Sequence, residues 1–142
     1  MIKGFRHTCV MIKDLEKSLR FYRDLIGLKL FKIITLEDGY ADKIFNKKGL
    51  KLTYAKLRSP YQSKNSPPIF ELHLWRKPKV THRPGYNHIS FTVKNLDGEY
   101  KRLKRSGVRF ISKPVVTGDG KRKICFCFDP DNNLIEFIED LR

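Results

Sequence analysis

Two stretches of alternating apolar and polar residues, FRHTCVMI and NHISFTV, each predict a short strand. A helix is expected after each strand, because Asp14 and Asn95 carry side-chain oxygens suited to an N-cap. Apolar residues then recur with the i, i+4, i+7 spacing of one buried helix face, and Gly27 or Gly107 follows as a helix end. The apolar positions are Leu15, Leu19, Tyr22 and Ile26 in the first helix and Leu96, Tyr100 and Leu103 in the second.

These two segments are copies of one repeat, because aligning them places His7 on His88 and Leu15 on Leu96, an offset of 81 residues (88 − 7). Further strands are expected at 28–36, 41–46, 51–57 and 69–75 in the first copy, where one of the middle two could be a loop, and at 108–112, 122–128 and 133–139 in the second. The sequence therefore predicts an α+β fold of two βαβββ modules. We expect one domain over 1–142, with module one at 1–75, a linker at 76–86 and module two at 87–142.

Each copy ends in an apolar strand that contains a carboxylate, Glu71 in IFELHLW and Glu136 in LIEFIE. Such a carboxylate is costly to bury unless it is paired or bound to a metal. His7 and His88 lie in the first strand of each copy, so four nitrogen and oxygen donors related by the repeat can converge on one divalent ion. Nickel, cobalt, zinc, manganese and ferrous iron suit such donors. A strand histidine can equally be a packing residue and a strand glutamate can face solvent, so the pattern leaves both interpretations open.

The charge of the chain indicates an anionic partner. Its 142 residues include thirty Lys and Arg against fifteen Asp and Glu, a formal net charge of +15. Nucleic acid, an acidic membrane or an anionic small molecule would fit this charge. We expect neither nucleic acid nor membrane as partner, because no nucleic-acid motif and no apolar run of about 20 residues occurs. We expect no secretory signal, because the stretch MIKGFRHTCVMIKD lacks a sustained apolar run, and three cysteines without CxxC spacing favour a reducing cytoplasm.

Three stretches, HTCVMIKDLEKSLRFYRDLIGLKL, YNHISFTVKNLD and DPDNNLIEFIE, resemble the vicinal oxygen chelate superfamily. That superfamily includes glyoxalase I, methylmalonyl-CoA epimerase, extradiol dioxygenases, and fosfomycin and bleomycin resistance proteins. The resemblance implies two βαβββ modules in an open barrel of mixed sheets, a homodimer, and one bound divalent metal ion. Its ligands would be His7, Glu71, His88 and Glu136, a set similar to that of bacterial glyoxalase I. The implied activity is that of a metal-dependent lyase or isomerase, with Glu136 as the base and Glu71 as its partner in proton transfer.

Strand alternation from these four residues predicts which neighbours line a substrate pocket. The pocket positions are Cys9, Met11, His73, Trp75, Ser90 and Thr92. Met11 and Trp75 stand where bacterial glyoxalase I carries an Arg and an Asn that hold glutathione, so we do not expect glutathione to be held in the same way. We expect a small anionic substrate. An extradiol-type dioxygenase, a CoA-ester epimerase and a non-catalytic small-molecule binder are the alternatives.

Overall fold

The computed structural model describes residues 7–37, 39, 42, 48–63, 69–77, 88–116 and 120–141. The chain divides into two compact units, Met1–Pro84 and Gly85–Arg142, which we call the first and the second unit. That division falls inside the stretch 76–86, for which the sequence predicts a linker. The arrangement of the two modules as one domain remains a prediction.

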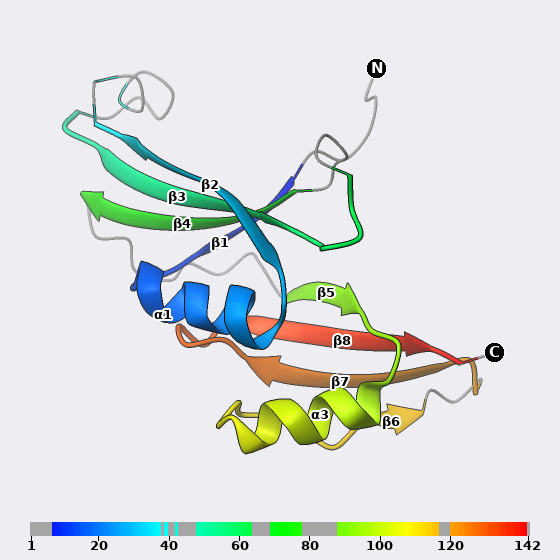
Figure 1. The fold of residues 1–142 in the computed structure, drawn as a ribbon. Helices are drawn as coiled ribbons and strands as arrows, with labels where there is room; N and C mark the ends of the chain where they lie inside the picture. Colours follow the sequence, from blue (N-terminus) through cyan, green and yellow to red (C-terminus); the bar gives the residue numbers. More distant parts are fainter. Residues whose placement is uncertain are drawn as a thin grey trace. The chain divides into compact units, whose positions relative to one another are not determined.

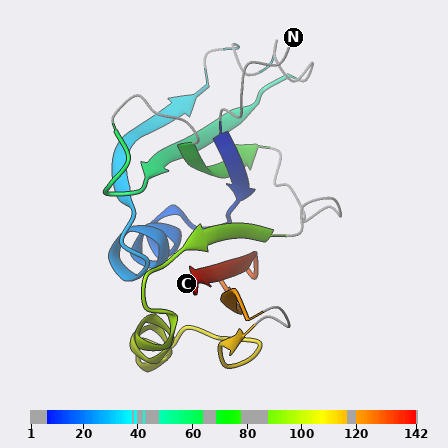
Figure 2. The same cartoon turned by 90° about the vertical axis from the view of Figure 1, so that its right-hand side faces the viewer.

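Both units have the same topology, a four-stranded mixed sheet with one helical segment after its first strand (Figures 1 and 2). In the first unit the elements are β1 (His7–Met11), α1 (Leu15–Leu19), η1 (Arg20–Leu25), β2 (Lys29–Leu36), β3 (Lys51–Arg58) and β4 (Ile69–Lys77), and the strand order is β1-β4-β3-β2. In the second unit they are β5 (His88–Thr92), α3 (Leu96–Arg105), β6 (Val115–Val116), β7 (Arg122–Phe128) and β8 (Leu134–Asp140), in the order β5-β8-β7-β6. The first and last strands of each unit pair in parallel, and the other neighbours are antiparallel. The predicted α+β fold and its internal repeat are confirmed.

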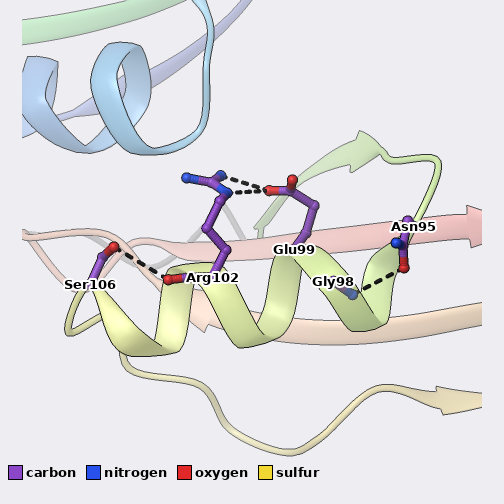
Figure 3. A network of polar contacts seen from close by, with 5 residues as sticks. All are labelled: Asn95, Gly98, Glu99, Arg102 and Ser106. Carbon is purple, nitrogen blue, oxygen red and sulfur yellow. Dashed lines mark hydrogen bonds and ion pairs between the residues drawn. The ribbon is translucent and has the colours of Figure 1, made fainter.

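Both helical segments begin at the predicted N-caps and are followed by the predicted glycines. The Asp14 carboxylate accepts the Lys17 N–H at 3.0 Å, and the Asn95 side-chain oxygen accepts the Gly98 N–H at the same distance. These bonds satisfy backbone donors that a helix start leaves unpaired. Figure 3 shows the Asn95 cap together with the Glu99–Arg102 ion pair farther along α3. Gly27 and Gly107 follow the two helices with φ angles of +89° and +84°, which glycine adopts without strain.

The first helical segment departs from the expected continuous α-helix. After α1 the chain forms π-helical turns over η1, where the Ile26 N–H donates to the Phe21 carbonyl five residues back at 2.9 Å. Two consecutive side chains, Phe21 and Tyr22, are both buried, at 4% and 0% exposure. The Tyr22 ring packs against Phe70 of β4 at 4.8 Å between ring centroids. The π turns thus give the first unit a wider apolar helix face than the i, i+4, i+7 pattern indicates.

The expected strand at 108–112 is wrong. Only Phe110 pairs, with Cys127 of β7, and the chain then bends through 111–113. Pro114 limits pairing beyond this bend, because it has no N–H to donate to a neighbouring strand. The other expected strand, 41–46, lies outside the described residues except for Asp42. Its carboxylate accepts the N–H groups of Gly49 and Leu50 at 2.8 and 2.7 Å.

In each unit the core lies between the helical segment and the sheet face that packs against it. In the first unit the buried apolar residues include Val10, Leu19, Phe21, Tyr22, Ala55, Leu57, Phe70 and Leu72; in the second they include Leu96, Leu103, Val108, Cys125, Cys127, Ile135 and Phe137. Because side chains alternate along a strand, Glu71 and Glu136 each lie on the face of their own sheet that points away from this core. Among the described residues, none of the helices has the length and hydrophobicity that crossing a membrane needs.

Candidate metal and substrate site

In both units the strand register sets a histidine diagonally beside a glutamate. Cys9 of β1 pairs with Glu71 of β4, and His7 comes two residues before Cys9. In the second unit Ser90 of β5 pairs with Glu136 of β8, and His88 comes two residues before Ser90. The two histidine–glutamate pairs therefore occupy equivalent positions of the repeat, and their side chains emerge on the sheet face that the core leaves free.

In the first unit, Glu71 lies among three potentially positive groups. His7 Nε2 is 3.9 Å from Glu71 Oε2, and His73 Nε2 donates to the same oxygen at 2.9 Å. Lys56 Nζ lies 3.4 Å from the other oxygen, Oε1. Burial opposes ionisation of the Glu71 carboxyl, which is 5% exposed. The hydrogen bond from His73 and the charges of His7, His73 and Lys56 outweigh that burial and hold the Glu71 pKa below its usual range.

In the second unit, Glu136 has apolar neighbours instead. His88 Nε2 is 3.4 Å from Glu136 Oε2, and the two side chains are 34% and 14% exposed. The His88 ring meets the Phe126 ring edge-on at 5.4 Å. Phe126 pairs with Glu136 across β7 and β8, the place that Lys56 takes opposite Glu71. The two carboxylates thus share a position in the repeat but not an electrostatic environment.

The six expected pocket residues lie on the same strands as these pairs. Cys9, Met11, His73 and Trp75 are half-buried in the first unit, whereas Ser90 and Thr92 are exposed in the second. His73 contacts one of the four predicted ligands, Glu71, through a hydrogen bond. Burial and the nearby Glu71 charge raise the pKa of the Cys9 thiol to about 12, so this thiol is protonated at neutral pH.

Sequence reasoning missed Lys56 and Tyr54 of β3. Tyr54 pairs with His73 across β3 and β4, and the two rings lie 5.3 Å apart. The Lys56 ammonium lies 5.6 Å from the centre of the Tyr54 ring and beside Glu71. The signal in the sequence was the alternation in KLTYAKLR, which puts Tyr54 and Lys56 on one face. Only the register with β4 reveals that this face is the one that carries Glu71.

Comparison with known proteins gives the family of the chain. The sequence profile of the Glyoxalase/Bleomycin resistance protein/Dioxygenase superfamily matches residues 4–137. The chain belongs to this superfamily.

Two relatives of this glyoxalase-superfamily chain are lactoylglutathione lyases. The one from Schizosaccharomyces pombe is 32% identical, and the match covers 93% of this chain but 46% of the yeast protein, so the chain spans about half of that relative. The one from Haemophilus influenzae is 30% identical, with 94% and 90% of the two chains covered. Among solved structures, a glyoxalase family protein from Bacillus cereus superposes with a TM-score of 0.85 at 19% identity, covering 100% of this chain and 97% of that one. At this identity the likeness shows the fold.

The donor sets of this superfamily member fit a divalent metal ion. Zinc and similar ions bind histidine nitrogen and carboxylate oxygen at about 2.0–2.2 Å, so two donors of one ion lie at most about 4.4 Å apart. The His7–Glu71 and His88–Glu136 separations, 3.9 and 3.4 Å, are both within that limit. Within the described residues, no three His, Cys, Asp or Glu side chains form a complete centre. Each unit therefore supplies a pair of donors.

Proposed function

We propose that this chain is a metal-dependent lyase or isomerase of the glyoxalase type, which moves a proton on a small oxygenated molecule. His7, Glu71, His88 and Glu136 would hold the divalent ion. When bound, that ion would act as a Lewis acid on an oxygen of the substrate. The observation that carries the proposal is the repeated register, which sets one imidazole and one carboxylate together in each unit.

The environments of the two carboxylates support different roles in proton transfer. Glu71 is engaged on both oxygens, by Lys56 on one and by His73 on the other. Glu136 has His88 beside one oxygen and Phe126, in place of a lysine, as its cross-strand partner, so its carboxylate is less engaged than that of Glu71. We therefore assign proton removal from the substrate carbon to Glu136 and proton return on the other face to Glu71, with His73 and Lys56 orienting the Glu71 carboxylate.

Metal content of the purified protein tests this proposal. We expect dialysis against nickel, cobalt, zinc or manganese to load the wild-type chain, and Glu136→Gln to lower its metal affinity at least about tenfold. Asp140→Asn is the matched control, since Asp140 is an exposed carboxylate on the same strand that pairs with Arg122. A wild-type chain that takes up none of these ions, or equal metal content in Glu136→Gln and wild type, would contradict the proposal.

Substrate class is the second part of the test. The protein loaded with metal should be assayed with a hemithioacetal, a CoA ester and a catechol. Because Met11 and Trp75 stand on strands beside the site, we expect a small anionic substrate to react without the glutathione contacts of bacterial glyoxalase I. A racemised CoA ester would point to an epimerase, and binding of each compound without turnover would point to a non-catalytic binder.

One observation favours an extradiol-type dioxygenase as a second candidate. Lys56 and His73 occupy both oxygens of Glu71, and this would leave His7, His88 and Glu136 as two histidines and one carboxylate. That set is the facial triad of non-haem Fe(II) oxygenases. Glu71→Gln separates the candidates, because the four-ligand site would lose metal and the three-ligand site would keep it. Oxygen uptake with a catechol, abolished by chelation, would decide for the dioxygenase.

The remaining expectations are a homodimer in the cytoplasm. The exposed apolar side chains of Ile111, Val115 and Val116, on or near the edge strand β6, support self-association. The three cysteines, Cys9, Cys125 and Cys127, are unpaired in the structure, in keeping with a reducing compartment. Light scattering after size-exclusion chromatography would give the mass of the particle directly.

A further inference from the structure

Four cations lie in two facing pairs on strands β2 and β3. Lys29 is the cross-strand partner of Arg58, and Lys32 is the partner of Lys56. Like charges placed directly opposite each other destabilise a sheet. We call Lys29, Lys32, Lys56 and Arg58 the cationic row.

The cationic row continues outward from Glu71. Lys56 pairs with Glu71 across β3 and β4, and Arg58 lies two residues farther along β3, so both project on the face that carries the site. The row thus reaches from Glu71 to the edge strand β2. Among the described residues, no carboxylate forms an ion pair with Lys29, Lys32 or Arg58, although Glu71 pairs with Lys56.

An exposed aromatic ring holds one member of the row in place. The Arg58 guanidinium lies 5.5 Å from the centre of the Phe31 ring, and Phe31 is 40% exposed. Phe31 is the extra residue where the β2–β3 register shifts between Leu30 and Lys32, which brings it onto the face of Arg58. A guanidinium stacked on a ring keeps its fork of N–H donors free for an anion.

The fold itself does not require this charge, because the second unit is built without it. At the positions of Lys56 and Arg58, the equivalent strand β7 carries Phe126 and Phe128. The first unit holds nineteen Lys and Arg against seven Asp and Glu, a net +12, whereas the second holds eleven against eight, a net +3. The positive charge of the protein is therefore a property of the unit that carries the row.

We propose that the cationic row binds a phosphate or diphosphate group of the substrate. Neighbouring strands lie about 4.8 Å apart, so a ligand reaching from Glu71 on β4 to β2 spans about 10 Å. A phosphorylated small molecule of that length would place its reacting oxygens beside Glu71 and its phosphate over Lys32 and Arg58. The assignment of the reacting end rests on the proposed function, but the anion site does not.

Calorimetric titration with inorganic pyrophosphate tests the anion site. The protein is first stripped of metal with a chelator and dialysed, so neither metal binding nor turnover enters the measurement. The test variant is Lys32→Gln with Arg58→Gln. The matched control is Lys101→Gln with Lys104→Gln on the exposed face of α3, which removes the same charge.

We expect wild type and control to bind pyrophosphate alike, within about twofold, and the row variant to bind at least about tenfold more weakly. Thermal melts by circular dichroism show whether each variant is folded. Arg58→Lys alone keeps the charge but loses the fork of N–H donors, so it should bind more weakly than wild type and more tightly than the row variant. Metal uptake should be the same in the row variant as in wild type. Failed metal uptake with intact pyrophosphate binding would overturn the proposed function and leave the anion site standing.

Three results would overturn the anion site. The first is that wild type does not bind pyrophosphate at about 0.15 M salt. The second is that the row and control variants lose the same amount of pyrophosphate affinity. The third is that duplex DNA displaces pyrophosphate from the row at a lower concentration than any organic phosphate does. The last result would identify the row as a nucleic-acid contact, whose affinity would fall steeply with salt.

Discussion

Asp129 holds the turn that leads into β8, and its removal should be among the most damaging single changes in the second unit. The side chain is 2% exposed. One carboxylate oxygen accepts the N–H groups of Asp131 and Asn133 at 2.9 and 2.8 Å, and the other accepts the Asn133 side-chain amide at 2.8 Å. Asn132, with a φ of +65°, also donates its backbone N–H to the Asp129 carbonyl at 3.1 Å. This turn sets the register of β7 with β8 and thereby the position of Glu136.

The size of the effect follows from these three bonds. A hydrogen bond to a charged group contributes about 1.5–3 kcal/mol, and part of that gain is offset by the cost of burying the carboxylate. We expect Asp129→Ala to lower the free energy of unfolding by about 4 kcal/mol, because it leaves two backbone N–H groups without an acceptor. Asp129→Asn keeps one oxygen for the backbone donors but loses the charge and the Asn133 amide contact, so about 2 kcal/mol is expected.

Urea unfolding followed by circular dichroism measures these changes. Asp140→Ala is the control, because its exposed ion pair with Arg122 should contribute no more than about 1 kcal/mol. The midpoint should move in the order Asp140→Ala, Asp129→Asn, Asp129→Ala, with unchanged slope. A loss below about 1 kcal/mol for Asp129→Ala would refute the reasoning, because three buried charge-assisted bonds could not then be holding the turn.

Three further predictions concern other parts of the chain. Ser18 is fully buried and its hydroxyl has no hydrogen-bond partner among the described residues, so Ser18→Ala should raise the free energy of unfolding by about 1 kcal/mol in the same urea assay; a loss of stability would mean that the hydroxyl is paired. Burial raises the pKa of Cys125 to about 11 and of Cys127 to about 12, so at pH 8 iodoacetamide should alkylate them at least about 100-fold more slowly in the folded chain than in urea. Because the unfolded thiols lose their protons first, these two groups should also make stability fall as pH rises from about 9 to 11, a slope that a Cys125→Ala, Cys127→Ala variant should reduce. Glu136→Gln should lower kcat on the substrate identified above by about 10²–10⁴-fold while Asp140→Asn leaves it unchanged, and equal kcat values would remove Glu136 from proton transfer.

The elements that the sequence predicts correctly are those whose signals are local. Asp14 and Asn95 mark the helix starts because an N-cap needs only one side-chain oxygen and a backbone donor three residues on. Glu71 and Glu136 stand out because a carboxylate in an apolar strand is unusual within a few residues of sequence. The internal repeat then relates the two pairs without any knowledge of the fold.

The features that sequence reasoning missed depend on contacts between distant residues. The π turns of η1 leave the apolar spacing of the sequence unchanged, and the structure reveals them through the Ile26–Phe21 backbone hydrogen bond and the burial of Phe21 beside Tyr22. The strand expected at 108–112 has the right composition, but in the structure only Phe110 forms a β-bridge, with Cys127, before the chain bends through 111–113. Lys56 looked like one more surface lysine, and its place beside Glu71 follows from a β3–β4 register that alternation alone cannot fix.

The parallel pairing of the first and last strands has a consequence for how the protein is made. Cys9 and Glu71 meet only after almost the whole first unit has left the ribosome, so this contact has a high sequence separation and should form late within its unit. The first unit nevertheless contains its own core and its own histidine–glutamate pair. A nascent chain can therefore complete that half before β8 and Glu136 have been synthesised, and synthesis from the N-terminus gives the two halves a fixed order of assembly.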